Sequence, residues 1–209
     1  MNINTSDYWT NRFATGSWTQ HGGKNQTRHF AKAQVKRLNL APDFAGTIVD
    51  FGCATGDAFP VYRAAFPNAK LIGVDFASSA IEQARQQYGD FAEFICGSVA
   101  EVPRCDVIIA SNVLEHIDND RQITLDLKRR CERLFVFVPY KEWPLDPEHV
   151  RCYDRDYYRA FGIRRREIFF CRGWTEMGRG LVRKGFANIG NIIRGDQLYR
   201  INRQIMFEM

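Results

Sequence analysis

The sequence predicts an α/β fold: a doubly wound sheet of about seven strands, mostly parallel, with helices on both faces. Two observations predict it. Short apolar runs recur between stretches of helical patterning, and strands that alternate with helices form parallel sheets. The runs are also almost continuously apolar, as in residues 134–138 (LFVFV), rather than alternating apolar with polar. That pattern is expected where helices cover both faces of a sheet.

The elements follow in order along the chain. We expect helices at 6–13, capped by Thr5 or Ser6, and at 24–38, with a glycine-containing loop at 14–23 between them. A first strand ends near Phe51. Up to Pro139 we expect further strands at 70–74, 93–96, 106–110 and 133–138, and helices at 58–65, 78–88 and 120–131. Beyond a loop to Val150 we expect a helix at 154–161, a strand at 166–170, a basic helical stretch at 175–194 and a last strand at 203–207.

The chain is built around residues 47–57 (TIVDFGCATGD), where an apolar run ends at an acid, an aromatic residue and a glycine. Gly52 and Gly56 permit backbone angles and close approaches that a Cβ would block. The pattern predicts a strand, a tight turn and a helix whose N-terminus faces a ligand. No Lys or Arg stands in the turn, and Asp50 and Asp57 flank it. We therefore expect a ligand with a positive group or hydroxyls rather than a bare pyrophosphate.

A second strand pattern, residues 70–76 (KLIGVDF), also ends at an acid. Asp75 follows Gly56 by nineteen residues, near the spacing at which a carboxylate on a second strand reaches a ribose. The spacing of Gly52 and Gly56 matches neither the dinucleotide-binding glycine motif nor the lysine-bearing phosphate loop. It therefore argues against an NAD-dependent oxidoreductase.

Four stretches, in this order, resemble the motifs of class I S-adenosylmethionine-dependent methyltransferases. They are residues 49–57 (VDFGCATGD), 73–85 (GVDFASSAIEQAR), 92–98 (AEFICGS) and 106–117 (DVIIASNVLEHI). The resemblance implies a Rossmann-like sheet whose last strand is antiparallel and lies beside the fifth, in a single domain over 1–209. Within it, 1–40 would form an N-terminal helical lid, 41–140 the cofactor-binding core, and 141–209 the acceptor-side elements and the sheet edge. Trp9, Trp18 and His21 are the candidate lid residues.

The resemblance implies S-adenosylmethionine as the cofactor. Asp50 and the backbone at Gly52 and Cys53 would meet its ammonium, and Asp75 would accept from its ribose hydroxyls. Where the family often has Gly-Asp in the third motif this chain has Gly97-Ser98, so a hydroxyl would replace a charge-assisted contact to the adenine amine. The predicted cofactor-binding residues are Asp50, Gly52, Cys53, Gly56, Asp75, Phe76, Gly97, Ser98 and Asn112. Asp57 either assists them or caps the following helix.

Methyl transfer is an in-line displacement, in which the enzyme mainly aligns an acceptor with an already activated methyl group. A hydroxyl acceptor also needs a base, and histidine suits that task near neutral pH. His116 and His149 are the predicted catalytic residues, with Tyr140 as a further polar group at the acceptor mouth. The spacing of acidic and histidine residues along the chain predicts no metal site.

The acceptor is predicted from the charge distribution. The 209 residues carry a net charge of +5, but residues from Arg151 onward hold thirteen Lys and Arg against six Asp and Glu, which is +7. Such a basic region suits an anionic partner. Together with a loose resemblance of this region to methyltransferases of cell-surface polysaccharide pathways, it predicts a small anionic or sugar-like acceptor, such as a hydroxyl of a nucleotide-sugar.

Two alternatives remain open: an RNA methyltransferase, and a non-catalytic module that binds S-adenosylmethionine and recruits a partner. The sequence contains no RNA-binding module and no interleaved aromatic and basic repeat, so nucleic acid is disfavoured without being excluded. The six cysteines form no Cys-x-x-Cys pair, which predicts reduced thiols. The sequence contains no apolar run long enough for a membrane span and no signal-peptide core, so we expect a cytoplasmic protein. Nothing specifies its oligomeric state.

Overall fold

The computed structural model describes residues 3–173, 179–199 and 202–209. A seven-stranded sheet in the order β3-β2-β1-β4-β5-β7-β6 forms its centre. Strands β1 (Thr47–Phe51), β2 (Lys70–Asp75), β3 (Glu93–Cys96), β4 (Cys105–Ser111) and β5 (Cys131–Pro139) are parallel. Strand β7 (Arg203–Glu208) lies antiparallel between β5 and β6 (Arg165–Phe170). The predicted fold class and the antiparallel last strand beside the fifth are confirmed.

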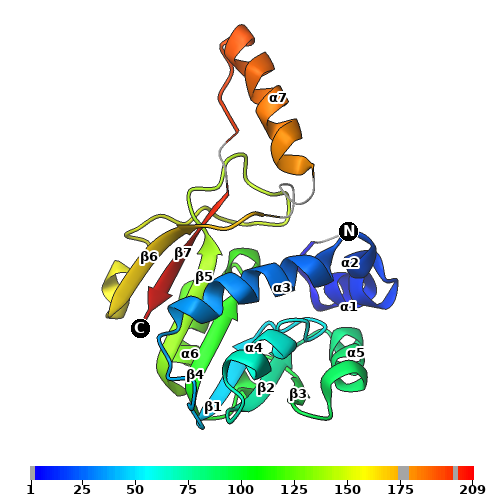
Figure 1. The fold of residues 1–209 in the computed structure, drawn as a ribbon, viewed down its shortest axis with the longest axis vertical. Helices are drawn as coiled ribbons and strands as arrows, with labels where there is room; N and C mark the ends of the chain where they lie inside the picture. Colours follow the sequence, from blue (N-terminus) through cyan, green and yellow to red (C-terminus); the bar gives the residue numbers. More distant parts are fainter. Residues whose placement is uncertain (1–2, 174–178, 200–201) are drawn as a thin grey trace.

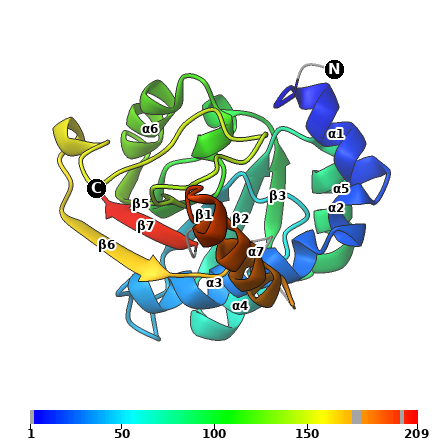
Figure 2. The ribbon, with the colours of Figure 1, turned by 90° about the horizontal axis from the view of Figure 1, so that it is seen from above.

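Helices cover both faces of the sheet, as Figure 2 shows from above. The helices α3 (Gly23–Gln34), α4 (Phe59–Ala65) and α5 (Ser78–Tyr88) pack on one core, and α6 (Asp120–Lys128) packs on the other. Strand residues alternate between the two cores: Phe135 and Phe137 belong to the first, and Leu134 and Val136 to the second. Both sets are fully buried, which explains the unbroken apolar run in β5.

The N-terminal region differs from its prediction in two respects. Helix α1 (Ser6–Ala14) begins as expected, with the hydroxyl of Thr5 accepting a hydrogen bond from the amide of Tyr8. The expected loop at 14–23, however, contains the short helix α2 (Ser17–Gln20). Helix α3 then ends at Gln34 and continues only as the 3-10 turn η1 (Val35–Arg37). Helices α1 and α2 lie beside α5 at one end of the molecule (Figure 1).

The other short helices are single 3-10 turns: η2 (Val99–Glu101), η3 (Leu114–His116) and η4 (Arg159–Phe161). The expected α-helix at 154–161 is therefore wrong, since only its last residues form η4. This segment buries Tyr153 and Tyr158 completely. Anchoring two large side chains in the core fixes an irregular path that local helix propensity alone does not predict.

Helix α7 (Gly180–Arg194) stands away from the sheet (Figure 1), and the predicted start of this stretch at Thr175 lies outside the described residues. Its polar side bonds to the chain that returns toward β7: Asn188 exchanges two hydrogen bonds with the backbone of Tyr199. Its opposite side leaves Phe186 and Ile193 70% and 80% exposed. None of the helices in the described part of the chain has the length and apolar content needed to cross a bilayer.

Candidate functional site

A cavity of about 360 Å³ lies at the carboxyl ends of β1, β2 and β4. The strand order reverses between β1 and β4, and open parallel sheets bind ligands at such a reversal. The volume falls within the range of roughly 300–1,000 Å³ that is common for small-molecule sites. Residues from the turn after β1, the end of β2, the loop after β4, helix α1 and the segment 139–149 line it. The cavity is therefore shared between the cofactor and acceptor regions predicted from sequence.

The turn after β1 is held in a strained, compact shape. Gly52 and Gly56 have φ of +77° and +75°, and Ala54 between them has φ +48°. The amides of Gly52 and Cys53 both donate to the carbonyl of Val74 on β2, at 2.8 and 3.2 Å. Glycine adopts these angles without a Cβ penalty, so the strain falls on Ala54, and the bonds to β2 hold the turn in place.

Asp75 clamps this turn to the start of α5. One carboxylate oxygen accepts from the amide of Ala54 and the other from the amide of Ala77, each at 2.9 Å. Asp75 thus holds the residue before α5 in place and also lines the cavity. Each carboxylate oxygen has a second acceptor site, so these bonds leave capacity for the hydroxyls of a ligand.

Asp50 lies at the end of β1 and is 5% exposed. Burial and, to a smaller extent, the nearby charge of Asp75 raise its pKa to about 8, against the opposing effect of a hydrogen bond from Tyr62. Burial likewise raises the pKa of Asp75. Two acids with raised pKa values lining one cavity favour a ligand that carries positive charge or donates hydrogen bonds.

Asn112 joins three elements at the end of β4, where its φ is +52°. Its side-chain oxygen accepts from Gln204 on β7 at 2.8 Å, and its amide donates to Ser111 at 3.1 Å. Gln34 of α3 donates to both Ser111 and Gln204. This network fixes the rim of the cavity where it meets the last strand.

The other predicted cofactor residues divide into two groups. Cys53 and Phe76 line the cavity with Asp50, Gly52, Asp75 and Asn112. In the described part of the chain, Gly56, Gly97 and Ser98 are not among the lining residues. A Cβ on Gly56 would meet Tyr88 at 3.0 Å, so that glycine allows close packing on α5.

Ser98 is engaged within its own turn. Its hydroxyl accepts from the amide of Ala100, while the carboxylate of Glu101 accepts from the backbone and hydroxyl of Ser98, at 2.7 and 2.9 Å. This reciprocal cap of η2 uses the groups that the sequence assigned to the adenine amine. Asp57 is similarly occupied, accepting from Thr55 and Tyr88 at 2.7 and 2.8 Å.

The two predicted catalytic histidines lie against each other. Their rings are 4.9 Å apart and nearly perpendicular, and both line the cavity together with Glu115. One potential ligand atom from each of Glu115, His116 and His149 lies within 4.8 Å of the others. The sequence-based expectation of no such cluster considered only neighbours along the chain, and folding brings His149 to the end of β4.

The environments of the three groups differ. Burial, with a smaller contribution from the charge of His149, lowers the pKa of His116 to about 3. Burial also lowers the pKa of His149, but its hydrogen bond with Glu142 and the charge of Glu115 outweigh this and the net shift is upward. Burial raises the pKa of Glu115 to about 7, against the opposing charge of His149. His116 is thus a neutral ring near pH 7.

Helix α1 closes one side of the cavity through Glu148. The carboxylate of Glu148 forms an ion pair with Arg12 and accepts from the hydroxyl of Tyr8, and its carbonyl accepts from Asn4 at 2.7 Å. Trp9 of the same helix packs edge-on against His116. Of the predicted lid residues, Trp9 and Trp18 line the cavity, whereas among the described residues His21 does not.

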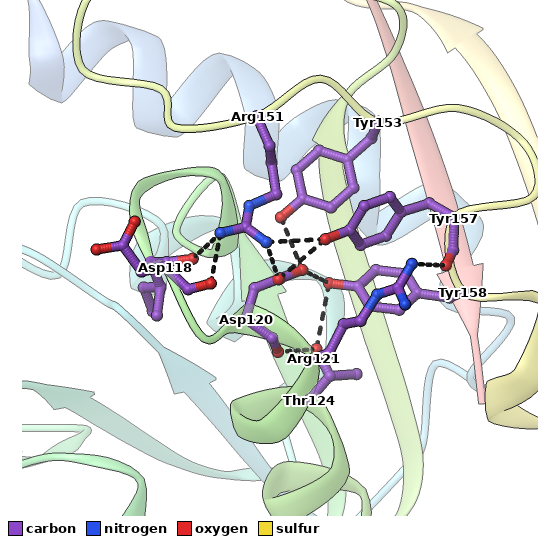
Figure 3. Close-up of polar contacts among 9 residues, drawn as sticks. Asp118, Asp120, Arg121, Thr124, Arg151, Tyr153, Tyr157 and Tyr158 are labelled. Carbon is purple, nitrogen blue, oxygen red and sulfur yellow. Dashed lines mark hydrogen bonds and ion pairs between the residues drawn. The ribbon is translucent and has the colours of Figure 1, made fainter.

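The segment that carries His149 is anchored by a buried acid, Asp120, at the start of α6. Figure 3 shows three tyrosines and Arg151 converging on its carboxylate. Tyr153, Tyr157 and Tyr158 donate at 3.1, 3.0 and 2.7 Å, and Arg151 forms an ion pair with it. Arg151 also donates to the carbonyls of Ile117 and Asp118, both at 2.7 Å. The first arginine of the basic region is therefore a structural residue, not a free cation.

Two other cations do reach the cavity. Lys141 and Arg203 both line it, and the guanidinium of Arg203 lies 5.0 Å from the centre of the Tyr140 ring. The amide of Tyr140 donates to the carbonyl of Arg203 at 2.8 Å, which ties the acceptor segment to β7. The sequence signalled Arg203 only through the overall charge of its region.

Comparisons with known proteins agree with this geometry. Residues 49–133 match a family model described as a methyltransferase domain. The chain is 31% identical over 127 residues to a malonyl-[acyl-carrier protein] O-methyltransferase of Anoxybacillus flavithermus; the match covers 58% of this chain and 48% of that relative. The chain thus spans about half the length of this relative.

Solved structures share the fold. The YcgJ protein of Bacillus subtilis superposes with a TM-score of 0.60 at 15% identity, covering 87% of this chain and 97% of that one. The plantazolicin methyltransferase BpumL, in complex with SAH, gives a TM-score of 0.60 at 12% identity over 98% of this chain and 95% of that one. At these identities the likeness concerns the fold alone.

Proposed function

The chain carries a class I S-adenosylmethionine-dependent methyltransferase domain, and from that premise we propose that it transfers the methyl group to an oxygen of a small anionic acceptor. A hydroxyl of a sugar or nucleotide-sugar is our first candidate. The observation that carries the proposal is the single cavity that joins Asp50 and Asp75 at one end to Lys141 and Arg203 at the other.

The acidic end suits the cofactor. S-adenosylmethionine is the methyl donor of this family, and it carries an ammonium, a sulfonium and two ribose hydroxyls. Asp50, with its raised pKa, would release its proton when an ammonium lies beside it, because the opposite charge favours the ionised carboxylate. Asp75 offers its two remaining acceptor sites to the ribose hydroxyls. Phe76, at the same rim, supplies an aromatic face for the adenine.

The acceptor end carries both signs of charge, since Lys141 and Arg203 line it together with Glu115, Glu142 and Asp146. Arg203 presents a planar guanidinium that can pair with a phosphate or carboxylate through two parallel hydrogen bonds. Lys141 adds a second positive charge nearby. The malonyl-[acyl-carrier protein] O-methyltransferase relative also acts on an oxygen, and a malonyl group carries negative charge. An anionic oxygen acceptor is the chemistry common to these observations.

In the proposed step the acceptor oxygen attacks the methyl carbon as the carbon–sulfur bond breaks, which leaves a neutral thioether. The proton of a hydroxyl acceptor leaves as the new bond forms. We assign its removal to the cluster of Glu115, His116 and His149, which includes both histidines predicted as catalytic. Holding acceptor and methyl group in line is the main contribution expected of the protein.

Calorimetry and a labelled-methyl assay test the proposal. S-adenosylmethionine and its demethylated product should bind, whereas NAD should not. Incubation with methyl-labelled cofactor should label a nucleotide-sugar or another small anion, and Arg203→Ala should raise the KM of that acceptor without changing the Kd of the cofactor. Binding of NAD with no binding of S-adenosylmethionine would overturn the proposal. Labelling of RNA alone, with an affinity for RNA that falls steeply with salt, would show that the acceptor is RNA and not a small anion.

A further inference from the structure

Glu115, His116 and His149 form a cluster that methyl transfer by itself does not explain. They come from η3 and from the distant segment after β5, yet one nitrogen or oxygen atom from each lies within 4.8 Å of the others. All three line the cavity. A catalytic base requires one of them, so the convergence of all three calls for a further reason.

Glu115 is the most unusual of the three. It is 1% exposed, and neither carboxylate oxygen has a hydrogen-bond partner in the described residues 3–173, 179–199 and 202–209. Buried carboxylates are normally paired, hydrogen-bonded or bound to a metal, because removing the charge from water is costly. Glu115 therefore presents two unused acceptor atoms to the cavity.

Both histidine rings are oriented by an oxygen at Nδ1. In His116 this atom lies 3.1 Å from the carbonyl oxygen of Glu148. In His149 it lies against the carboxylate of Glu142. A hydrogen bond donated from Nδ1 leaves Nε2 without a proton and free to act as a ligand, and metal-bound histidines are commonly held in this way. The same orientation recurs in two rings that face one carboxylate.

We propose that Glu115, His116 and His149 bind one divalent transition-metal cation. Two imidazoles and a carboxylate suit zinc, manganese or iron, and three protein ligands leave coordination positions for a further oxygen. Glu142 is a positioning residue that acts through His149. A catalytic role for the cation rests on the proposed function: with the cation bound, the acceptor oxygen would coordinate it, align with the methyl group and lose its proton to solvent rather than to the three ligands.

The test measures binding before activity. The protein is stripped with a chelator and titrated with Mn²⁺, which has little affinity for thiolates, while electron paramagnetic resonance reports the free ion. We expect saturable binding of one ion per chain. Zn²⁺ is titrated in a Cys96→Ser/Cys152→Ser background, because these two cysteines are exposed. The melting temperature should rise with the concentration of the bound ion.

Variants identify the ligands. Glu115→Gln and His149→Asn should abolish binding, and Glu142→Gln should weaken it by about 10–100-fold, the effect typical of residues that orient a ligand. His29→Gln is the matched control: it removes an imidazole from α3 outside the cavity lining and should leave binding unchanged. Glu115→Gln removes only a buried charge, so the variant should fold. If Glu115→Gln does not fold, His149→Asn tests the same metal site.

The outcomes separate this inference from the proposed function. Absence of saturable binding, or unchanged binding in both Glu115→Gln and His149→Asn, overturns the metal site, whatever the cofactor does. Binding of S-adenosylmethionine to the metal-free protein is measured separately and tests the proposed function alone. Once an acceptor is known, full turnover by the metal-free protein would overturn the catalytic role of the cation while leaving the binding site standing.

Discussion

The two ends of the cavity are built in different ways. At the cofactor end, Asp50 and Asp75 each close a strand, and Asp75 bonds to amides in the adjoining turn and helix. At the acceptor end, the segment 140–158 is irregular and depends on distant partners: Glu148 binds Tyr8 and Arg12, and Arg151 binds Asp120. Strand geometry fixes the first end, while long-range polar contacts fix the second. Substitutions should therefore affect the two ends separately.

The largest expected effect is at the acceptor end. Asp120→Ala leaves Arg151 and three tyrosine hydroxyls without their shared acceptor. Breaking one partner of a buried ion pair costs about 3–5 kcal/mol, and we expect a loss of that size in the free energy of unfolding measured with urea. In conditions where the variant is still folded, the Kd for S-adenosylmethionine should change little.

Asp118→Ala is the matched control for Asp120→Ala. Asp118 is exposed and contacts Arg151 through its backbone carbonyl, not its carboxylate (Figure 3). Its replacement should change the free energy of unfolding by no more than about 0.5 kcal/mol, as for most surface substitutions. Equal losses in the two variants would show that Asp120 does not anchor the segment.

The next effect lies at the cofactor end. Asp75→Ala removes the expected ribose acceptor and should weaken binding of S-adenosylmethionine by about 1.5–3 kcal/mol, the scale for hydrogen bonds to a charged group. Calorimetry measures the change. Asp106→Ala is the control, because it also removes a carboxylate that accepts from a backbone amide. Asp106 accepts from the amide of Thr47 at 2.7 Å, at the amino edge of the sheet and away from the cavity. An unchanged Kd for Asp75→Ala would mean that Asp75 only joins the turn to the start of α5.

Gly52→Ala tests the turn itself. A Cβ at Gly52 would lie 2.5 Å from the side chain of Val113, in addition to the strain of φ +77°. A side chain at Gly52 would thus clash first with Val113, itself a lining residue. The left-handed strain alone costs about 1–2 kcal/mol, and displacement of Val113 should also weaken cofactor binding in calorimetry.

Gly195→Ala separates strain from clash. Gly195 has φ +73° with nothing within 4 Å of an added Cβ, and it follows α7. Gly195→Ala should lower the free energy of unfolding by about as much as the left-handed strain in Gly52→Ala, but it should bind the cofactor normally. If Gly52→Ala also binds normally, the turn does not approach the ligand.

A further test is the pH dependence of Asp50. Its ordinary pKa of 3.8 is raised to about 8 in the folded protein, chiefly by burial. Between these values the folded state holds a proton that the unfolded state has released, so the contribution of Asp50 to stability falls as pH rises from about 4 to 8. Urea unfolding across this window should show Asp50→Asn to be less sensitive to pH than the unsubstituted protein. A steeper dependence in the variant would contradict the assignment.

Binding of the cofactor provides a second test of the protonation of Asp50. An ammonium beside it should release the proton near pH 7, and calorimetry in buffers of different ionisation enthalpy measures that release. The same proton release in Asp50→Asn would assign it to another group.

Much of the sheet could be predicted because its signals are local. The strands that end at Phe51, Asp75 and Ser111 bury both faces, so their apolar runs stand out in the sequence. The same reasoning failed at residues 154–161, where burial of Tyr153 and Tyr158 overrides a helical pattern. The assignment of Ser98 to the cofactor remains a prediction, and its bonds within η2 could not be foreseen from a motif alignment.

The sequence by itself determined the order of strands and helices, the glycine turn and the acids that end β1 and β2. Each of these depends on residues within a few positions of one another, and over so short a stretch the backbone geometry determines which residues are neighbours. Only the tertiary structure decided that His149 meets Glu115 and His116, that Arg151 pairs with the buried Asp120, and that Arg203 reaches the cavity. Such contacts join segments far apart in the chain. No local pattern encodes them, because the order of the strands in the sheet determines which of the following loops meet.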